Sequence, residues 1–143
     1  MSSFAYTEPV RLAQVGVGYW GRNLLRNAAA IPGAEIVAVC DRSGDALDLA
    51  GRLAPRARLT EDVDSVLADP SVEAVILATE TPTHADLAAQ ALEAGKHVFV
   101  EKPLAQTTED AARLVALAEV QGRRLMVGHL LRYHPAYRHV ERL

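Results

Sequence analysis

Residues 10–21, which read VRLAQVGVGYWG, decide the fold. A short apolar run precedes Gly16, Gly18 and Gly21, whose spacing is G-x-G-x-x-G, and an amphipathic stretch follows at 20–30. This order predicts a strand, a tight turn and the start of a helix. Gly16 allows the turn, Gly18 lets a pyrophosphate approach the backbone, and Gly21 lets helix and strand pack closely. We therefore expect an anion-binding helix N-terminus, and the alternative is an ordinary strand-to-helix turn.

The rest of the chain alternates short apolar runs with longer amphipathic stretches, which is typical of strands and helices around a parallel sheet. Strands are expected at 10–17, 35–40, 57–59, 74–78, 97–100 and 125–127. Helices are expected at 20–30, 45–53, 61–68, 83–95, 107–122 and from 135 onward. Right-handed crossovers then give an α/β fold with a doubly wound parallel sheet, the Rossmann fold, in strand order 3-2-1-4-5-6. Ligands of such sheets bind beyond the carboxyl ends of the first and fourth strands.

Three threonines, Thr60, Thr83 and Thr107, are expected to begin helices. The last two are each followed three residues later by an aspartate, which is the spacing of a capping box. Gln14 fits none of these patterns, because it is a polar residue inside an apolar strand, and the sequence offers no explanation for it.

Asp41 follows the expected second strand, twenty residues after Gly21. A carboxylate at this position accepts hydrogen bonds from the ribose hydroxyls of a dinucleotide and repels a 2′-phosphate, so the sequence favours NAD over NADP. The adjacent Arg42 keeps NADP open, because a guanidinium pairs with a phosphate or lies over an adenine face. The alternative for Asp41 is a turn cap ahead of Ser43 and Gly44.

Lys102 lies in the sequence Glu101-Lys102-Pro103, at the expected carboxyl end of the fifth strand and near the expected place of a nicotinamide. It is one of only two lysines among fifteen basic residues. An ammonium there can bond a substrate oxygen and stabilise charge as an alcohol becomes a ketone and hydride leaves to the cofactor. The alternative is a solvated lysine at a strand end.

Composition and charge exclude several classes of protein. The 143 residues are 50% apolar and 23% charged with a net charge of −3, which is typical of one soluble domain and gives no reason to expect a nucleic-acid partner. No apolar run of about 18 residues and no signal-peptide pattern occurs, so no membrane span and a cytoplasmic location are expected. The histidines 129, 134 and 139 are spaced five apart, on different sides of a helix, so no metal site is expected.

The chain from Val10 resembles the cofactor domain of the Gfo/Idh/MocA oxidoreductases. The resemblance rests on VGVGYWG, on Asp41, on residues 78–100 (ATETPTHADLAAQALEAGKHVFV) running into Glu101-Lys102-Pro103, and on Val127-Gly128-His129. It implies an NAD(P)-dependent dehydrogenase or reductase of sugars, inositols or nucleotide sugars, with Lys102 at the active site. The cofactor-binding residues are then expected to be Gly16, Gly18, Tyr19, Trp20, Gly21, Asp41, Arg42, Thr79, Thr81, Pro82, His84, Glu101 and Lys102. For His84, a structural role in bonding a loop is an equal alternative.

Residues 128–137 (GHLLRYHPAY) resemble a subgroup that oxidises position 3 of UDP-activated N-acetylated sugar acids. Arg132 and Tyr133, with Lys102, are the candidate substrate contacts. Residues 123–143 carry five Arg and one Glu, and this basic segment fits an anionic substrate such as a nucleotide sugar. The alternative is a solvated basic helix face.

The resemblance also implies a second, substrate-binding domain, which is absent from this sequence. We expect residues 1–9 to be an extension, 10–134 the NAD(P)-binding domain and 135–143 the start of a junction helix. One half-site cannot hold a sugar against a nicotinamide, so turnover by this chain alone is not expected. An exposed docking surface would favour a homo-oligomer. The competing hypothesis is a stand-alone, non-catalytic NAD(P)-binding or sensing module. A methyltransferase fits less well because it leaves Glu101-Lys102-Pro103 unexplained.

Overall fold

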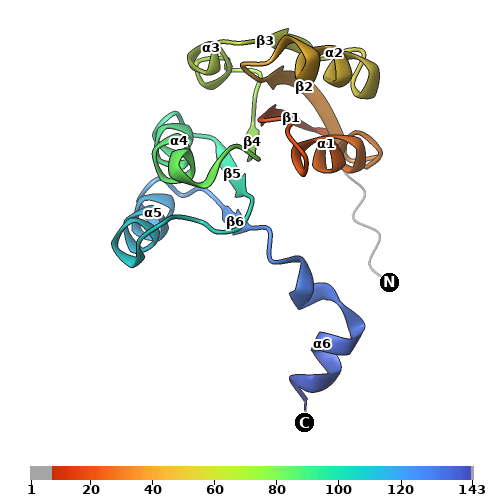
Figure 1. Cartoon of the computed structure of the whole chain (residues 1–143). Coiled ribbons are helices and arrows are strands. Elements are labelled where there is room, and N and C mark those ends of the chain that lie inside the picture. The colour runs from red at the N-terminus through yellow and green to blue at the C-terminus, as the bar shows by residue number, and fades with distance from the viewer. Residues whose placement is uncertain (1–7, 143) are drawn as a thin grey trace.

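The computed structural model describes residues 8–142. Six strands form one parallel sheet in the order β3-β2-β1-β4-β5-β6 (Figure 1), which confirms the predicted doubly wound α/β fold. The strands are β1 (Val10–Val15), β2 (Ala34–Cys40), β3 (Arg58–Thr60), β4 (Ala74–Leu77), β5 (His97–Val100) and β6 (Leu125–Val127). The helices are α1 (Gly21–Ala29), α2 (Gly44–Leu53), α3 (Val63–Leu67), α4 (Thr81–Glu93), α5 (Thr108–Val120), the short 3-10 helix η1 (Leu130–Tyr133) and α6 (Pro135–Val140).

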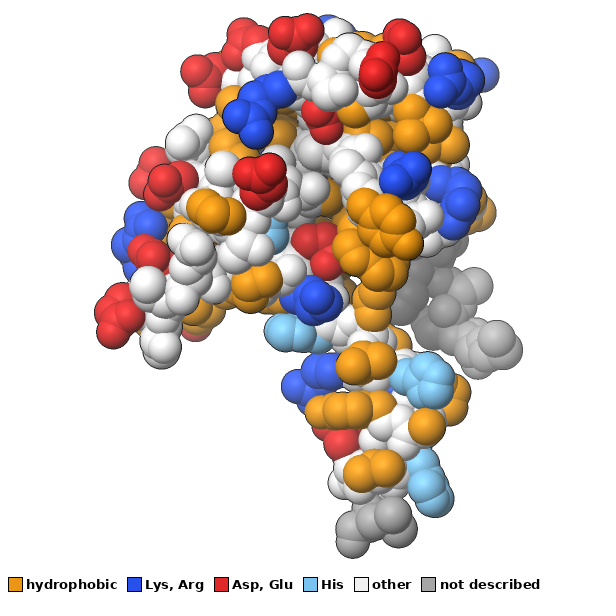
Figure 2. Space-filling model, viewed as in Figure 1, with side chains coloured by type: hydrophobic (Ala, Val, Ile, Leu, Met, Phe, Trp, Pro, Cys, Tyr) orange, Lys and Arg blue, Asp and Glu red, His pale blue; other side chains and the backbone are white. Residues whose placement is uncertain are grey.

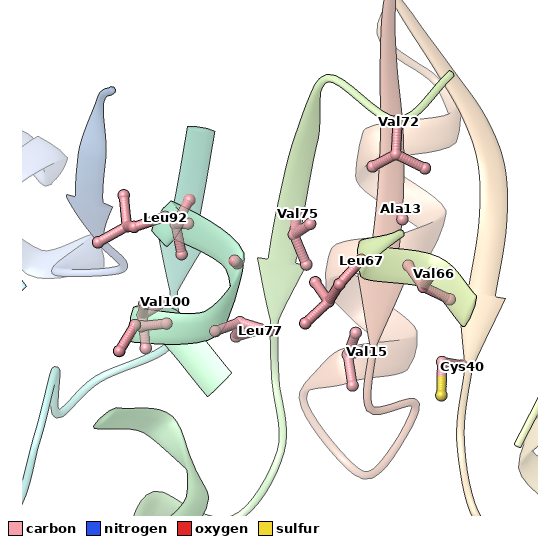
Figure 3. Packing of buried hydrophobic residues seen from close by; sticks show 14 of the residues in the cluster. Ala13, Val15, Cys40, Val66, Leu67, Val72, Val75, Leu77, Leu92 and Val100 are labelled. Atoms are coloured by element: carbon pink, nitrogen blue, oxygen red, sulfur yellow. The ribbon is translucent and has the colours of Figure 1, made fainter. Parts of the chain in front are cut away.

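Helices cover both faces of the sheet. The α1 and α2 helices pack on one face, and α3, α4 and α5 pack on the other, where Figure 3 shows Leu67 of α3 and Leu92 of α4 beside the strands. Along β2, Ala38 and Cys40 pack with the second group of helices, while Val39 between them packs with the first. Strands covered on both sides read as unbroken apolar runs, which is why the sequence located them within a few residues.

The α3 helix begins at Val63, and the expected cap at Thr60 was wrong. The Asp62 carboxylate accepts the N–H groups of Asp64 and Ser65 at 3.0 and 3.3 Å. Thr60 instead ends β3, and its hydroxyl accepts the N–H of Asp62 at 3.0 Å. A carboxylate at Asp62 satisfies two of the N–H groups that a first helical turn leaves free.

The α4 helix begins at Thr81, so the expected capping box at Thr83 was also wrong. Pro82 fits the first turn because a proline there lacks only an N–H that has no helical partner. The Thr83 hydroxyl donates to the Glu80 carbonyl oxygen at 2.8 Å and does not cap the helix. The helix therefore starts four residues after β4 ends, close to the carboxyl edge of the sheet.

The capping box of α5 is confirmed. The N–H of Asp110 donates to the Thr107 hydroxyl oxygen at 3.1 Å, and that hydroxyl donates to the Asp110 carboxylate at 2.8 Å. Hydrogen bonds with Thr107 and then Arg113 lower the pKa of Asp110, so the carboxylate stays charged at the positive end of the helix.

The C-terminal segment, η1 and α6, extends away from the sheet (Figure 1) and contains no buried residue. Figure 2 shows hydrophobic, basic and histidine side chains together on it. A helix starting at Pro135 was expected and is confirmed. Residues 1–7 of the expected extension, and Leu143, lie outside the described residues. Within residues 8–142, no helix has the length and apolar character needed to cross a membrane.

Candidate functional site

A cavity of about 730 Å³ opens at the carboxyl ends of β1, β2 and β4, the edge where the strand order predicts a ligand. Eight of the expected cofactor residues line it: Gly16, Gly18, Tyr19, Trp20, Asp41, Arg42, Thr79 and Pro82. Five others do not: Gly21, Thr81, His84, Glu101 and Lys102. The wall also contains three acidic residues that the sequence did not point to, namely Glu61, Glu80 and Asp86.

The three glycines of the turn have different surroundings. Gly16 has a φ of +92°, and a Cβ added to it would lie 2.5 Å from the Ala78 carbonyl oxygen. A Cβ on Gly21 would press on the Gly16 carbonyl, whereas one on Gly18 would meet no atom within 4 Å. Gly16 and Gly21 are therefore needed to fold the turn, and Gly18 faces open space.

Free N–H groups lie within this turn, just before α1. Among the described residues, the backbone N–H groups of Gly18, Tyr19 and Trp20 have no acceptor, and the α1 helix that follows has no acidic side chain in its first turn. Tyr19 and Trp20 are exposed, with their rings edge to face at 5.9 Å. Free donors at a helix N-terminus fit a phosphate group.

Asp41 makes the hydrogen bonds of a turn cap and also lines the cavity. One carboxylate oxygen accepts the N–H of Val17 at 2.6 Å, and the other accepts the N–H of Ser43 at 2.9 Å. The turn-cap interpretation is thus correct as far as Ser43 is concerned. A half-buried carboxylate keeps further lone pairs, so it can still accept hydrogen bonds from ligand hydroxyls. Burial and then the Asp41 charge raise the pKa of the neighbouring Cys40 thiol, which keeps the thiol protonated and unreactive.

The charge of the cavity wall is predominantly negative. Four carboxylates line it, those of Asp41, Glu61, Glu80 and Asp86, together with one cation, the exposed guanidinium of Arg42. Such a wall disfavours additional negative charge close to Asp41.

Glu101 lies at the end of β5 and is buried, with 8% of its surface exposed. One carboxylate oxygen accepts the N–H of Lys102 at 3.0 Å, and the other has no hydrogen-bond partner in the described part of the chain. A Cβ on Gly128 would lie 3.2 Å from that unpaired oxygen, so the glycine makes room for it. A buried acceptor without a donor fits a ligand group that donates a hydrogen bond.

The two lysines have opposite environments. Lys96 is buried, and its ammonium donates to the carbonyl oxygens of Asp69 and Val72 at 2.7 and 2.9 Å. Lys102 is exposed and forms no ion pair within residues 8–142. Lys96 is therefore structural, while the ammonium of Lys102 is free to meet a ligand.

His84 is a structural link and does not line the cavity. It is buried, its Nδ1 lies 2.7 Å from the Pro103 carbonyl oxygen, and its Nε2 lies 3.0 Å from that of Thr79. A neutral imidazole donates to one of these oxygens at a time. Of the two interpretations the sequence left open, the contacts favour the residue that bonds a loop. The ring joins the end of β4 to the segment that carries Lys102.

The structure does not bring Arg132 and Tyr133 to the cavity. Arg132 pairs with Glu141, just after α6, at 3.6 Å, and Tyr133 lies under the Arg138 guanidinium at 5.8 Å. No group of three His, Cys, Asp or Glu side chains that could hold a metal ion occurs among the residues searched, 8–142.

The fold and the glycine turn at its carboxyl edge define a Rossmann-type nucleotide-binding domain. Residues 10–129 match the family described as "Oxidoreductase family, NAD-binding Rossmann fold", GFO_IDH_MocA. The chain therefore belongs to the Gfo/Idh/MocA oxidoreductases, as the sequence motifs suggested.

Two curated relatives and one solved structure illustrate the similarity. Inositol 2-dehydrogenase 3 of Saccharopolyspora erythraea is 39% identical over 137 residues, which is 94% of this chain and 40% of that protein. D-apiose dehydrogenase of Paraburkholderia graminis is 38% identical over 130 residues, 91% of this chain and 35% of that protein. KijD10, a 3-ketoreductase from Actinomadura kijaniata solved with NADP and TDP-benzene, matches with a TM-score of 0.86 at 30% identity, over 93% of this chain and 41% of that chain.

The chain thus spans about two fifths of the length of these proteins. These relatives are named for an inositol, a sugar and a ketoreductase activity, and the expected subgroup acting on UDP-activated sugar acids stays a prediction.

Proposed function

We propose that this chain is the NAD-binding part of an oxidoreductase that transfers hydride between a hydroxyl or ketone of a sugar or nucleotide sugar and nicotinamide. The observation that carries the proposal is the cavity at the carboxyl edge, where a glycine turn with free N–H groups faces the Asp41 carboxylate. When bound, the cofactor supplies the acceptor or donor of hydride.

The chain's own residues divide the binding between them. The N–H groups of Gly18, Tyr19 and Trp20 hold the pyrophosphate, since they are free donors at the start of α1. Asp41 accepts hydrogen bonds from the adenine ribose. The unpaired oxygen of Glu101 accepts a hydrogen bond from the ribose next to the nicotinamide.

Lys102 acts on the substrate. Its exposed ammonium donates a hydrogen bond to the substrate oxygen at the reacting carbon, orients it, and stabilises the negative charge that develops on that oxygen. This role follows the family resemblance at Glu101-Lys102-Pro103 and the absence of an ion pair for Lys102 within residues 8–142.

NAD is the preferred cofactor in this proposal. Four carboxylates and one guanidinium line the cavity, and a 2′-phosphate would add about two negative charges close to Asp41. KijD10 was solved with NADP, so this proposal rests on the side chains around the ribose and not on the fold alone. Arg42 is the single residue of the wall that favours NADP.

The substrate class rests on the relatives and on charge. The relatives are named for an inositol, a sugar and a 3-ketoreductase activity. The basic segment at 123–143 suits an anionic substrate such as a nucleotide sugar. Arg132 and Tyr133 lie on this segment, and with Lys102 they are the proposed substrate contacts.

Calorimetric titration with NAD, and in parallel with NADP at the same salt concentration, tests the proposal. We expect saturable NAD binding that is tighter than NADP binding. NAD affinity should be about tenfold lower in Asp41→Ala, because the ribose hydrogen bonds and the bonds that Asp41 accepts from the Val17 and Ser43 N–H groups are lost. Glu35→Ala, a change of a carboxylate at the opposite end of β2, is the matched control and should leave NAD affinity unchanged. No binding of either dinucleotide would overturn the proposal.

A non-catalytic NAD(P)-binding or sensing module is the second candidate function, since Lys102 lies outside the cavity of about 730 Å³. A spectrophotometric assay of nicotinamide reduction with inositol, sugar and nucleotide-sugar substrates separates the two, when run on a protein that joins this chain to a substrate domain. Turnover that Lys102→Ala abolishes supports the oxidoreductase, and unchanged turnover contradicts the role of Lys102.

A further inference from the structure

Gln14 is the polar residue within β1 that the sequence left unexplained, and it is completely buried, with 0% of its surface exposed. Its side-chain Nε2 donates to the Gly16 carbonyl oxygen at 2.8 Å and to the Gly21 carbonyl oxygen at 2.7 Å. Both partners are acceptors, so the end of the amide that faces them must be the NH₂ group. A glutamine is therefore required in this orientation, and neither an ionised glutamate nor an apolar side chain makes these bonds.

The two hydrogen bonds join the first and last glycines of the turn. Gly16 directly follows β1, and Gly21 is the first residue of α1. The three residues with free N–H groups lie between them. The contact is tight, because a Cβ on Gly21 would already lie 3.3 Å from the Gln14 Nε2. One amide thus fixes the separation of the two ends of the turn from inside the sheet.

The amide oxygen of Gln14 lowers the net gain in folding stability from this side chain. Its Oε1 is buried and has no hydrogen-bond partner in the described part of the chain. An unpaired buried acceptor costs free energy that offsets much of the gain from the two donated bonds. The position of the turn, more than the stability of the sheet, is what the buried amide determines.

We propose that Gln14 is a positioning residue for dinucleotide binding: its buried amide holds the Gly16–Gly21 turn in the conformation that presents free N–H groups to a pyrophosphate. This inference rests on the proposed function for its ligand. It concerns a residue that touches no part of the cavity itself, since Gln14 is not among the residues that line it.

The test uses two variants of the whole chain with a matched control. Gln14→Met keeps the size and removes both donors, and Gln14→Asn keeps the amide but shortens its reach. Val72→Ala is the control, a buried change before β4 at the opposite edge of the sheet from the turn. Each protein is titrated with NAD and with adenosine, which lacks the pyrophosphate, at a temperature where thermal unfolding shows it to be folded.

Both Gln14 variants should bind NAD about tenfold more weakly than the parent and adenosine within about twofold of it, because only pyrophosphate contacts depend on the turn. The control should bind both ligands as the parent does. Unchanged NAD affinity in Gln14→Met, or equal losses for NAD and adenosine, would overturn the proposal.

Hydrogen exchange without ligand keeps this inference separate from the proposed function. The amides of Gly16 and Arg22, which donate to the carbonyl oxygens of Cys40 and Gly18 at 2.8 and 3.1 Å, should exchange faster in Gln14→Met than in Val72→Ala. Emission from Trp20, the only tryptophan, should shift in the first variant alone. If the parent binds no dinucleotide but these signals change, the proposed function fails while the role of Gln14 in holding the turn stands. If the signals do not change, the positioning role is contradicted.

Discussion

The two halves of the site differ in how completely the chain builds them. Around β1 and β2, the glycine turn, Asp41 and the acidic wall enclose a cavity of about 730 Å³. At the end of β5, Glu101 is buried with an unpaired oxygen, but Lys102 is exposed and neither residue lines that cavity. The first half therefore has the shape and donors of a binding site, whereas the second combines a buried carboxylate with an exposed ammonium outside that cavity.

This difference separates binding from chemistry within one chain. Dinucleotide affinity should depend on the glycine turn, which Gln14 holds, and on Asp41, which accepts the Val17 N–H beside that turn. Catalysis needs a substrate fixed against the nicotinamide as well, and Lys102 lines neither the cavity of about 730 Å³ nor the smaller cavity beside α5. Substitutions in the two halves should therefore have unequal effects on NAD affinity.

The largest effect is expected at the turn, from the pair Gly16→Ala and Gly18→Ala. Alanine at residue 16 meets a strained φ and the Ala78 carbonyl, so it should lower both the unfolding temperature and NAD affinity, the latter about a hundredfold. Alanine at residue 18 meets no protein atom, so it should weaken NAD binding while the unfolding temperature stays near that of the parent. Calorimetry and thermal unfolding measure both. Equal affinities for parent and Gly18→Ala would show that the pyrophosphate does not approach this glycine.

A smaller effect is expected on the β5 side, from Gly128→Ala. The added Cβ would lie 3.1 Å from the Phe99 ring and 3.2 Å from the unpaired Glu101 oxygen, so the carboxylate must move by a few tenths of an ångström. NAD affinity should fall about threefold, measured by titration. Gly122→Ala, beyond the end of α5, is a glycine change remote from the cavity and should leave affinity unaltered. A loss as large as that of Gly18→Ala would contradict the unequal halves.

Lys102→Ala should change NAD affinity by less than about twofold, because the side chain is exposed and outside the cavity. The same calorimetric titration measures it. A tenfold loss of NAD affinity would mean that Lys102 contributes to cofactor binding, and it would contradict the assignment of Lys102 to substrate chemistry alone.

Lowering the pH should lower the stability of the fold through His97, which does not line the cavity. Burial, followed by the charges of Arg123 and Arg124, lowers the pKa of His97 from its ordinary 6.5, against an opposing effect of Glu73. The folded chain then binds fewer protons than the unfolded chain, so this contribution to stability is complete above pH 6.5 and is lost as the pH falls toward the lowered value. Protonation also breaks the bond from the Arg124 N–H to the His97 Nδ1, 2.9 Å long.

The unfolding temperature should accordingly be lower near pH 5.5 than near pH 7.5, and the difference should be smaller in His97→Gln. NAD affinity measured at a temperature where the chain is folded should not follow His97, which begins β5 at the edge of the sheet opposite the cavity. If the unfolding temperature of His97→Gln changed with pH as much as that of the parent, groups other than His97 would cause the change. The carboxyls of Asp69 and Glu73 are not expected to contribute in this range, because hydrogen bonds lower their pKa values from the ordinary 3.8 and 4.5 and their contribution to stability is lost only on further acidification.

Local patterns predicted most of the fold and about half of the site. The apolar runs in the sequence predicted the strands, because helices cover both faces of the sheet, and the spacing of the glycines predicted the turn. Cap positions were less predictable: at α4, Pro82 starts the helix before Thr83 can cap it, and at α3 a carboxylate two residues on replaces Thr60. Which of several neighbouring residues caps a helix depends on where the preceding strand ends. A rule based on residue spacing alone does not include that position.

The unpredicted part of the site comes from contacts distant in sequence. Three acidic residues line the same cavity as Asp41 only because the strand order brings the ends of β3 and β4 to it, namely Glu61, Glu80 and Asp86. Gln14 did leave a signal, a polar residue in a buried strand, but its partners are backbone carbonyls that sequence does not reveal.

The most direct test of the central claim is an amide chemical-shift map of the chain during titration with NAD. We predict saturable shifts at residues 16–21, at Asp41 and at residues 79–83, with little change along α5 and β6. Saturable shifts confined to the β5 and β6 side, or none at any concentration of NAD, would contradict the assignment of this cavity to the dinucleotide.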